Sequence, residues 1–271
     1  MAWAEDALET LAADCAGCCS RACVRYWRMS TTMIETFGEV VGPVGAFLPV
    51  MPGVVSADRQ RAAAVRLESA GYRSAWSNEV IGKDAFVQLG VLLAATQHMT
   101  FGTCVANIWA RTAQTTAGAA AQLADAYPGR FVLGLGVGYA PQAESVGRDF
   151  GKPLATVASY VAAMGSDTSY PRLLGAMGPK MLALAGEVTD GALSAGVAPG
   201  FTADARGVLG RDKLLVVYVD ASSSTADVPG LARAHLAAGA DHVILGGALG
   251  ADFADHIDRL VALAPALTAL T

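Results

Sequence analysis

The sequence predicts an α/β fold, a (β/α)8 TIM barrel formed by a single domain. Short apolar runs alternate with stretches that have one apolar helical face, which is typical of parallel strands joined by crossover helices. Eight such units can be counted from residue 41 onward, and eight is the number that barrel closure requires. The chain of 271 residues is close to the roughly 250 residues of one such barrel. An open, doubly wound sheet of eight strands is the alternative.

The first four units occupy residues 41–164. Their helices end at residues suited to stopping a helix, Gly71 after the first helix and Pro128-Gly129 after the third. The fourth strand, with the sequence RFVLGLGV, is the most strand-like segment of the chain. The expected strands are Val41–Pro49, Tyr72–Val80, Met99–Ile108 and Arg130–Val137, and the expected helices are Ala57–Ala70, Asp84–Thr96, Thr112–Ala126 and Pro153–Met164.

The last four units are more compact than the first four. Each again pairs an apolar run with an amphipathic stretch. The expected strands are Arg172–Ala176, Asp190–Val197, Lys213–Asp220 and Ala240–Gly246, and the expected helices are Lys180–Val188, Thr202–Leu209, Pro229–Ala238 and Asp252–Leu263.

Residues 1–40 are expected to be an N-terminal extension, poorly ordered or helical, that adds nothing to a catalytic barrel of residues 41–271. The extension holds Cys15, Cys18, Cys19 and Cys23, and thiolates are ligands for zinc and for iron–sulfur clusters. No histidine or second cysteine pair lies nearby to complete a familiar site. We therefore predict no metal site.

The composition favours a small-molecule substrate. Hydrophobic residues make up 53% and charged residues 16% of the chain, the net charge is −5, and no run of Lys and Arg occurs. Nucleic acids and anionic membranes require clustered positive charge, so neither is an expected partner. No run approaches the ~20 apolar residues of a membrane-spanning helix, and the N-terminus is acidic. The expected location is the cytoplasm.

In a barrel of this kind, the groups that act on a ligand follow the C-terminal ends of the strands. The second expected strand ends in Trp76, Ser77, Asn78 and Glu79, and the third ends in Asn107, Ile108 and Trp109, with Arg111 close behind. The first ends in the apolar segment 49–52. Glu79 is the acid or base candidate at this end, although it could equally cap a helix or pair with Lys83 four residues on.

Two glycine-containing strand ends are further candidates. Alternate glycines in Gly134–Tyr139 would let a flat ligand or a neighbouring backbone approach closely, but the spacing lacks the form of a dinucleotide fingerprint. The segment Gly175–Lys180 places a lysine at a helix start, which is either a phosphate site or only a helix start with proline in its first turn. Gly246-Gly247, after the last strand, is a second candidate anion site.

The four histidines are the usual acids and bases near neutral pH. None is placed at a strand end in the expected fold. His98 precedes a strand, His235 and His256 lie in helices, and His242 begins a strand. We expect all four to be structural or on the surface.

Four strings carry a resemblance to a known family: GYRSAWSNEVIG (71–82), LLAATQHMTFGTCVANIWAR (92–111), YPGRFVLGLGVGY (127–139) and LLGAMGPKMLALAGEVTDGAL (173–193). Together they resemble the luciferase-like monooxygenase superfamily, and more narrowly its branch of oxidoreductases that use the deazaflavin coenzyme F420. The likeness runs in order from about residue 41 to residue 264. The strings ANIWAR and MGPKML are the most specific to that branch.

The resemblance implies an enzyme whose barrel mouth holds a flavin or deazaflavin ring, with the ribityl phosphate near the rim. It implies a bulge with a non-proline cis peptide behind the ring, near Val105–Ile108. The residues expected to act in catalysis are Glu79 and Asn107. The residues expected to bind the cofactor are Trp76, Asn78, Val105, Ala106, Asn107, Ile108, Gly136, Val137, Gly138, Tyr139, Ala176, Met177, Gly178, Pro179 and Lys180.

The expected function is hydride transfer between coenzyme F420 and an organic substrate. The alternatives are an FMN-dependent monooxygenase of the same superfamily and a non-catalytic ligand-binding barrel. Two departures motivate the last one: many relatives have a histidine after the second strand, and relatives insert a helical segment after the seventh, where this barrel is shortened to Asp220–Pro229. The resemblance also implies a homodimer.

Overall fold

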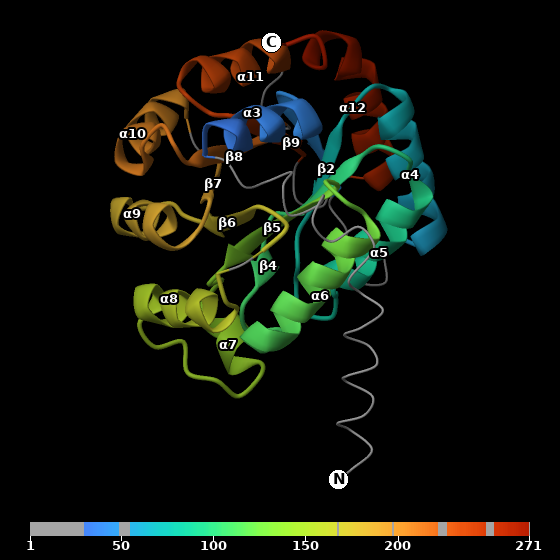
Figure 1. The fold of residues 1–271 in the computed structure, drawn as a ribbon. Coiled ribbons are helices and arrows are strands. Elements are labelled where there is room, and N and C mark those ends of the chain that lie inside the picture. The colour runs from blue at the N-terminus through green and yellow to red at the C-terminus, as the bar shows by residue number, and fades with distance from the viewer. Residues whose placement is uncertain are drawn as a thin grey trace, which may run out of the picture.

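The structure is a computed structural model that describes residues 30–48, 55–166, 168–196, 198–221, 227–247 and 252–270. Its strands form one parallel sheet in the order β3-β2-β1-β9-β8-β7-β6-β5-β4, and β3 also pairs with β5. This last pairing closes the sheet, so the predicted (β/α)8 TIM barrel is confirmed and the open sheet is excluded. Figure 1 shows the helices as an outer ring around the strands.

The barrel strands fall inside the expected ranges and are shorter than expected. The strands are β1 Val44–Phe47, β2 Ser74–Ser77, β3 Thr100–Thr103, β4 Ala106–Asn107, β5 Phe131–Gly136, β6 Arg172–Gly175, β7 Gly191–Ala195, β8 Leu214–Asp220 and β9 His242–Gly246.

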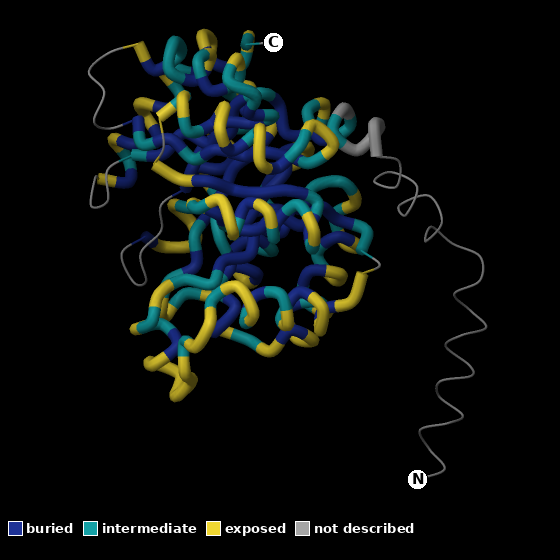
Figure 2. Tube along the Cα trace, turned by 90° about the vertical axis from the view of Figure 1, so that its left-hand side faces the viewer, coloured by how far each residue is buried: buried dark blue, intermediate teal, exposed yellow. Residues whose placement is uncertain are grey.

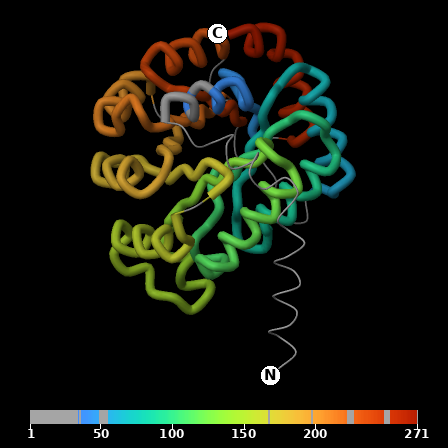
Figure 3. The backbone as a smooth tube through the Cα atoms, viewed as in Figure 1, coloured from blue at the N-terminus to red at the C-terminus, as the bar shows by residue number. Residues whose placement is uncertain are grey.

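The helices follow the strands in alternation, with one short addition after β5. Side chains cap several helix starts, as Ser56, Asp84, Thr112 and Asp252 each accept a hydrogen bond from a first-turn amide. Figure 3 follows the chain around the ring until α12 returns beside α4. The helices are α3 Ser30–Val41, α4 Ala57–Ser69, α5 Ala85–Ala95, α6 Ala113–Ala126, α7 Ala140–Glu144, α8 Pro153–Ala163, α9 Pro179–Val188, α10 Pro199–Leu209, α11 Val228–Ala237 and α12 Phe253–Leu267.

The third expected strand is interrupted by a bulge. β3 and β4 both pair with β5, but Gly102 lies opposite Val132 and Ala106 lies opposite Leu135. Between these two pairs, the β3–β4 strand advances by four residues and β5 by only three. One extra residue on one strand is the signature of a bulge. The Cys104–Val105 peptide bond is cis, so the non-proline cis peptide expected near this position is present.

The glycines of β5 give the bulge its space. A Cβ atom at Gly134 would lie 2.1 Å from the carbonyl oxygen of Thr103, and one at Gly136 would lie 2.3 Å from Val105 Cγ2. Both distances are far below van der Waals contact, so side chains are excluded at these positions. Of the two reasons foreseen for the alternate glycines, the approach of a neighbouring backbone is the one that the structure shows.

The barrel interior is centred on Trp76, which is fully buried. Gly102 and Gly45 flank the indole, because a Cβ at either position would lie within 2.8 Å of the Trp76 side chain. The indole Nε1 donates to Nε2 of His242 at 3.0 Å, and Nδ1 of His242 lies 2.7 Å from the carbonyl oxygen of Gly42. A carbonyl can only accept and an indole N–H can only donate, so His242 is neutral, with its proton on Nδ1.

Helix α3 covers the N-terminal end of the barrel. Phe37 and Val41 are fully buried in the same cluster as Trp76 and the inward side chains of the strands. Ser74 Oγ donates to the carbonyl oxygen of Val41 at 2.9 Å. The end of the expected extension is therefore helical and is part of the fold, contrary to the expectation that it adds nothing. The cysteines 15–23 and the apolar segment 49–52 lie outside the described residues.

Burial divides the molecule into a dry centre and a polar surface. Figure 2 shows the buried residues along the strands and the exposed ones on the outer faces of the helices. His235 and His242 are fully buried and His98 is exposed, as expected for structural and surface histidines. Among the helices that the structure describes, none combines the length and the apolar character needed to cross a membrane.

We expect Gly102→Ala to destabilise the protein by about 1–3 kcal/mol, the usual cost of overpacking a core. The new methyl group would meet ring carbons of Trp76 at 2.2 Å. Gly118→Ala in α6 is the matched control, because a Cβ there meets nothing within 4 Å. The control should gain up to about 1 kcal/mol in helix propensity. Urea denaturation measures both changes, and equal stabilities of the two variants would contradict the packing described for Trp76.

We expect the free energy of unfolding to fall as the pH drops from about 6.5 toward 4. Burial lowers the pKa of His242 to about 4, so the unfolded chain binds a proton that the folded chain rejects. The stabilisation is present above pH 6.5 and its loss amounts to about 3 kcal/mol once the pH reaches the folded pKa. His242→Gln, whose amide can make both hydrogen bonds, should show a shallower pH dependence in thermal denaturation. An equally steep dependence in the variant would refute this assignment.

Candidate functional site

The C-terminal mouth of the barrel has a floor of small residues. Four of the inward positions at or near the ends of their strands carry no side chain or a methyl group only: Gly136, Gly175, Ala195 and Gly246. Larger side chains from β1 and β8 and from the bulge surround them, namely Phe47, Tyr218, Cys104 and Val105, which share one apolar cluster. The described part of the mouth therefore has an apolar floor, in which Val105 and Tyr218 occupy the space beside Gly136 and Gly246.

Tyr218 is the polar group on this floor. Its ring meets Phe47 edge to face, with centroids 5.0 Å apart, and Gly246 makes room for it, since a Cβ there would lie 2.0 Å from the phenol oxygen. Burial, with the charges of Asp220 and Cys104, raises the pKa of Tyr218 to about 12. The phenol is thus protonated at neutral pH and can donate a hydrogen bond. Burial likewise raises the pKa of the Cys104 thiol to about 12, so it is no thiolate nucleophile.

Glu79 is held in a buried ion pair. Its carboxylate is paired with the Arg111 guanidinium through both oxygens, and the two side chains are 2% and 10% exposed. Arg111 also pairs with Asp84 at 2.8 Å and lies over the Phe86 ring. Of the alternatives foreseen for Glu79, helix capping is found, because Oε1 accepts from the amide of Ala85, the first residue of α5. The pairing with Lys83 is wrong, since Arg111 takes that place.

The same glutamate fixes the bulge. Glu79 Oε2 accepts from the backbone N–H of Asn107 at 2.8 Å, and the N–H of Glu79 donates to the carbonyl oxygen of Val105 at 3.3 Å. Glu79, in the loop after β2, is therefore hydrogen-bonded to the residues on both sides of Ala106. Glu79 acts on the shape of the mouth through the bulge.

Lys83 joins a buried polar network beneath the loop after β2. Its Nζ donates to Ser77 Oγ at 2.9 Å and to Asn78 Oδ1 at 3.1 Å, and Ser77 Oγ donates to Gln88 Oε1. Burial lowers the pKa of Lys83 to about 8, opposed by the charge of Glu79. Asn78 is therefore engaged by a lysine at the edge of the mouth, where it was expected to bind cofactor.

Asn107 lies where the bulge meets the loop after β5. Its side-chain oxygen accepts from the N–H of Trp109 at 2.9 Å, and its Nδ2 faces Gly138, 3.6 Å from where a Cβ would stand. Gly138 has a positive φ of 59°, which glycine adopts without strain. The Trp109 indole donates to the carbonyl oxygen of Val137 at 2.7 Å. The ends of β4 and β5 are thus joined, with Tyr139 exposed beside them.

The start of α9 lies next to the floor. Met177 Sδ accepts from the N–H of Ala195 at 3.2 Å, and Ala176 is held by Ser194 Oγ, which donates to its carbonyl oxygen at 2.7 Å. Gly178 is the N-cap of α9, Pro179 is its first residue, and Lys180 is exposed. Both foreseen roles for this segment, a phosphate site and a plain helix start, are compatible with this geometry.

The fold brings most of the expected site residues to one end of the barrel. The mouth is surrounded by the bulge, the end of β5 and the start of α9. Trp76, in contrast, is fully buried below the floor and hydrogen-bonded to His242, so it presents no surface to a ligand. Ala106 and Ile108 are also buried, at 1% exposure each. Their side chains pack outward in the core between the strands and the helices.

Two residues at the mouth were not foreseen from the sequence. Tyr218 follows Leu214 and Val216 at every second position, so period-two alternation along β8 could have shown it pointing inward. His256 was expected to be structural because it lies in a helix. Its Nε2 donates to the carbonyl oxygen of Phe47 at 2.8 Å, and a Cβ at Gly247 would lie 2.5 Å from its Nδ1. It is therefore at the rim between β1 and β9, which only tertiary contact reveals.

A flavin or deazaflavin ring suits this mouth on two observations. The described floor is apolar, as the face of a tricyclic ring requires, and the bulge of Cys104 and Val105 forms one wall of it. The α9 start, with the free amide ends of its first turn and Lys180 beside them, fits the distal phosphate. These residues would hold the group, and the described residues contain no cluster of His, Cys, Asp and Glu that could hold a metal.

Sequence comparison agrees with this geometry. Residues 40–166 match the family model of luciferase-like monooxygenases. A 5,10-methylenetetrahydromethanopterin reductase of Methanolobus tindarius is 31% identical over 151 residues, 46% of each chain. A protein of Mycobacterium tuberculosis named as a coenzyme F420-dependent oxidoreductase is 31% identical over 163 residues, 46% of this chain and 47% of its own. The matched region spans about half the length of these curated relatives.

Solved structures share the fold at low identity. An F420-dependent secondary alcohol dehydrogenase, bound to an F420–acetone adduct, superposes with a TM-score of 0.69 and 16% identity over 83% of this chain and 98% of its own. The oxygenating constituent of 3,6-diketocamphane monooxygenase from Pseudomonas putida, with FMN bound, gives 0.64 and 12% over 83% and 97%. The resemblance seen in the sequence is confirmed at this level: residues 40–166 match the luciferase-like monooxygenase family model, and proteins named for F420-dependent activity are among those similar to this chain.

Proposed function

We propose that this protein is an oxidoreductase that transfers hydride between coenzyme F420 and a small organic substrate at the barrel mouth. The observation that carries the proposal is the floor of Gly136, Gly175, Ala195 and Gly246 beside the bulge at Cys104 and Val105. A ring held flat there leaves its outer face to a substrate, and such positioning is the main contribution of a protein to hydride transfer. The named relatives that use F420 support the choice of cofactor.

When bound, the deazaflavin supplies the hydride chemistry, and the residues of this chain supply position and protons. The Tyr218 phenol, protonated at neutral pH, would be a hydrogen-bond donor to a ligand on the floor. Glu79 and Arg111 hold the bulge in shape and keep it from shifting. Asn107 presents its Nδ2 toward the loop at Gly138, where a polar edge of a ligand would lie.

An FMN-dependent monooxygenase is the second candidate. The FMN-bound monooxygenase with the same fold favours it, because the floor would accept either ring. The two enzymatic candidates are distinguished by which cofactor the mouth binds, F420 or FMN. A non-catalytic ligand-binding barrel is the third reading, and it predicts that changes at Asn107 or Gly178 leave cellular function intact.

Titration with F420 and with FMN, followed by quenching of ligand fluorescence, tests the proposal. We expect F420 to bind at micromolar concentration and FMN to bind at least tenfold more weakly. Ala195→Phe should abolish binding, because it adds a ring to an exposed position on the floor. Ala162→Phe, at an exposed position on α8, is the matched control and should bind normally. Tighter binding of FMN would favour the monooxygenase, and no binding of either ligand would reject both enzymatic proposals.

We expect Glu79→Gln to weaken cofactor binding about tenfold and to destabilise the fold by about 3 kcal/mol, the low end of the cost of removing one partner of a buried ion pair. We expect the low end of this destabilisation because Arg111 would still be paired with Asp84 in the variant. The exposed Glu144→Gln is the control and should change neither quantity. Thermal denaturation and the same titration measure the two effects. Lost stability with unchanged affinity would show that the bulge does not shape the cofactor site.

A further inference from the structure

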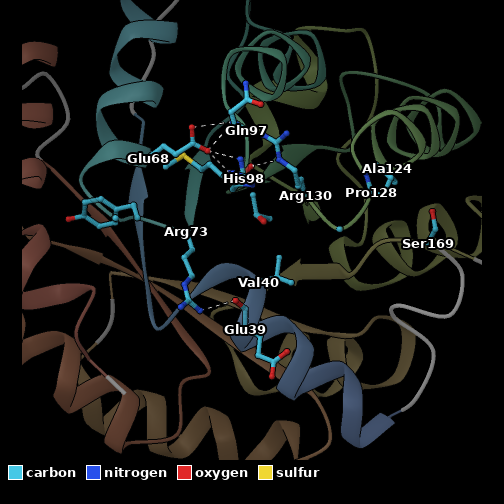
Figure 4. Close-up of a pocket in the computed structure, with 15 residues that line it drawn as sticks. Glu39, Val40, Glu68, Arg73, Gln97, His98, Ala124, Pro128, Arg130 and Ser169 are labelled. Carbon is cyan, nitrogen blue, oxygen red and sulfur yellow. Dashed lines mark hydrogen bonds between the residues drawn. The ribbon is translucent and has the colours of Figure 1, made fainter. Parts of the chain in front are cut away.

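A cavity of about 710 Å³ opens at the end of the barrel opposite the mouth. Its walls come from segments just before β2, β3 and β5 and from the end of α3, with Ser169 before β6 (Figure 4). These are the N-terminal ends of the strands, so the cavity is separate from the proposed cofactor site. Its volume is that of a pocket for a small organic molecule.

The walls are mainly apolar. Val40 of α3, Tyr72, Met99, Ala124 and Pro128 line the cavity. An organic molecule with an apolar body would gain burial here that water cannot provide. Apolar walls alone do not distinguish one apolar molecule from another, so any preference for a ligand must come from the polar groups at the cavity.

Two of the charged side chains that line the cavity are engaged by backbone groups, and a third is the exposed carboxylate of Glu39. Glu68 accepts hydrogen bonds from the amides of residues 97–99, and the Arg130 guanidinium donates to the carbonyl oxygens of Leu93, Thr96 and Met99. Neither is released without breaking these contacts. They act as structural clamps on the loop before β3.

Arg73 is different from these clamps. Its Nη1 donates to the carbonyl oxygen of Glu39 at 2.9 Å, a contact drawn as a dashed line in Figure 4. The ion pairs found within the described residues include no partner for it. Its side chain is exposed, and the guanidinium retains further donors for a carboxylate or a sulfonate. Arg73 is thus a cation at the cavity with no acidic partner in the described part of the chain.

Thr100 adds an independent sign of a ligand. It lines the cavity and is fully buried, and its Oγ1 has no hydrogen-bond partner in the described structure. It shares the inward face of β3 with Gly102, on the side where α3 lies. Buried hydroxyls normally find a partner, and a polar ligand atom at the inner end of the cavity would supply it.

We propose that this cavity is a second ligand site for a small organic anion with an apolar body and one carboxylate or sulfonate group. Arg73 pairs with the anionic group at the cavity opening. The apolar walls bury the body, and the Thr100 hydroxyl donates to a polar atom at the inner end. The site is independent of the mouth and of the reaction proposed there.

The test uses two fluorescent probes that differ in charge. The full-length protein is titrated with 8-anilinonaphthalene-1-sulfonate, an apolar anion, and with N-phenyl-1-naphthylamine, its uncharged analogue. We expect the sulfonate to bind with one-to-one stoichiometry and about tenfold more tightly than the amine. Saturating F420 should leave the affinity unchanged, because the cofactor would occupy the other end of the barrel.

Three variants and one control locate the binding. Arg73→Gln should weaken the sulfonate about tenfold and leave the amine unchanged, and Thr100→Val should weaken the anionic probe about fivefold. Val40→Trp should abolish binding of both probes by filling the cavity. Arg233→Gln, an exposed arginine on α11, should change neither. Thermal denaturation checks that each variant is folded.

Three outcomes would overturn the proposal. The first is sulfonate affinity that survives Arg73→Gln in a folded protein. The second is probe binding that survives Val40→Trp, which would place the probe elsewhere. The third is displacement of the sulfonate by F420, which would assign it to the mouth. The first two outcomes do not involve F420, and the third requires F420 to bind, so each would overturn this proposal without overturning the proposed cofactor site.

Discussion

The close approach of the β3–β4 bulge to β5 is the constraint on which the mouth depends. Thr103 and Val105 come so near the β5 backbone that only glycine fits at positions 134 and 136. Because β5 carries no side chains at these positions, Thr103 and Val105 occupy the space above its backbone and form this side of the mouth. Glu79, after the end of β2, accepts a hydrogen bond from the bulge, and Arg111 forms an ion pair with Glu79. The shape of the candidate site thus follows from the packing of the bulge against the glycines of β5, and one buried ion pair holds the bulge in place.

The two ends of the barrel differ in what fills them. Below the floor, Trp76 and the neutral His242 form a dry centre with every polar atom of the pair bonded, and α3 covers it. Burial of such groups is favourable only when their hydrogen bonds are made, so this region stabilises and offers nothing to a ligand. Above the floor the polar groups lie at an edge that solvent reaches. At the opposite end, the Thr100 hydroxyl has no hydrogen-bond partner within the described chain, and Arg73 has no acidic partner there.

Several features could be predicted from the sequence because local chemistry fixes them. The eight β/α units follow from apolar periodicity, and the ends of helices follow from residues such as Gly71 and Thr112. The non-proline cis peptide beside Val105 was expected from the family resemblance. Trp76 was expected at the cofactor because it precedes a strand end, but the inward alternation of β2 places it in the core.

What the sequence alone determined was the eight alternating β/α units and the end of the strands at which a candidate site would lie, since both depend on periodicity and chain direction. Closure of the sheet, which excludes the open alternative, was decided by the pairing of β3 with β5. The tertiary structure decided which residues meet. Glu79 pairs with Arg111 rather than Lys83 because β2 and the loop after β4 converge in space, across a separation of 32 residues. His256 reaches the rim at Phe47 across 209 residues for the same reason. Contacts between segments that are distant in the sequence depend on how the sheet closes, so they cannot be predicted from local sequence patterns.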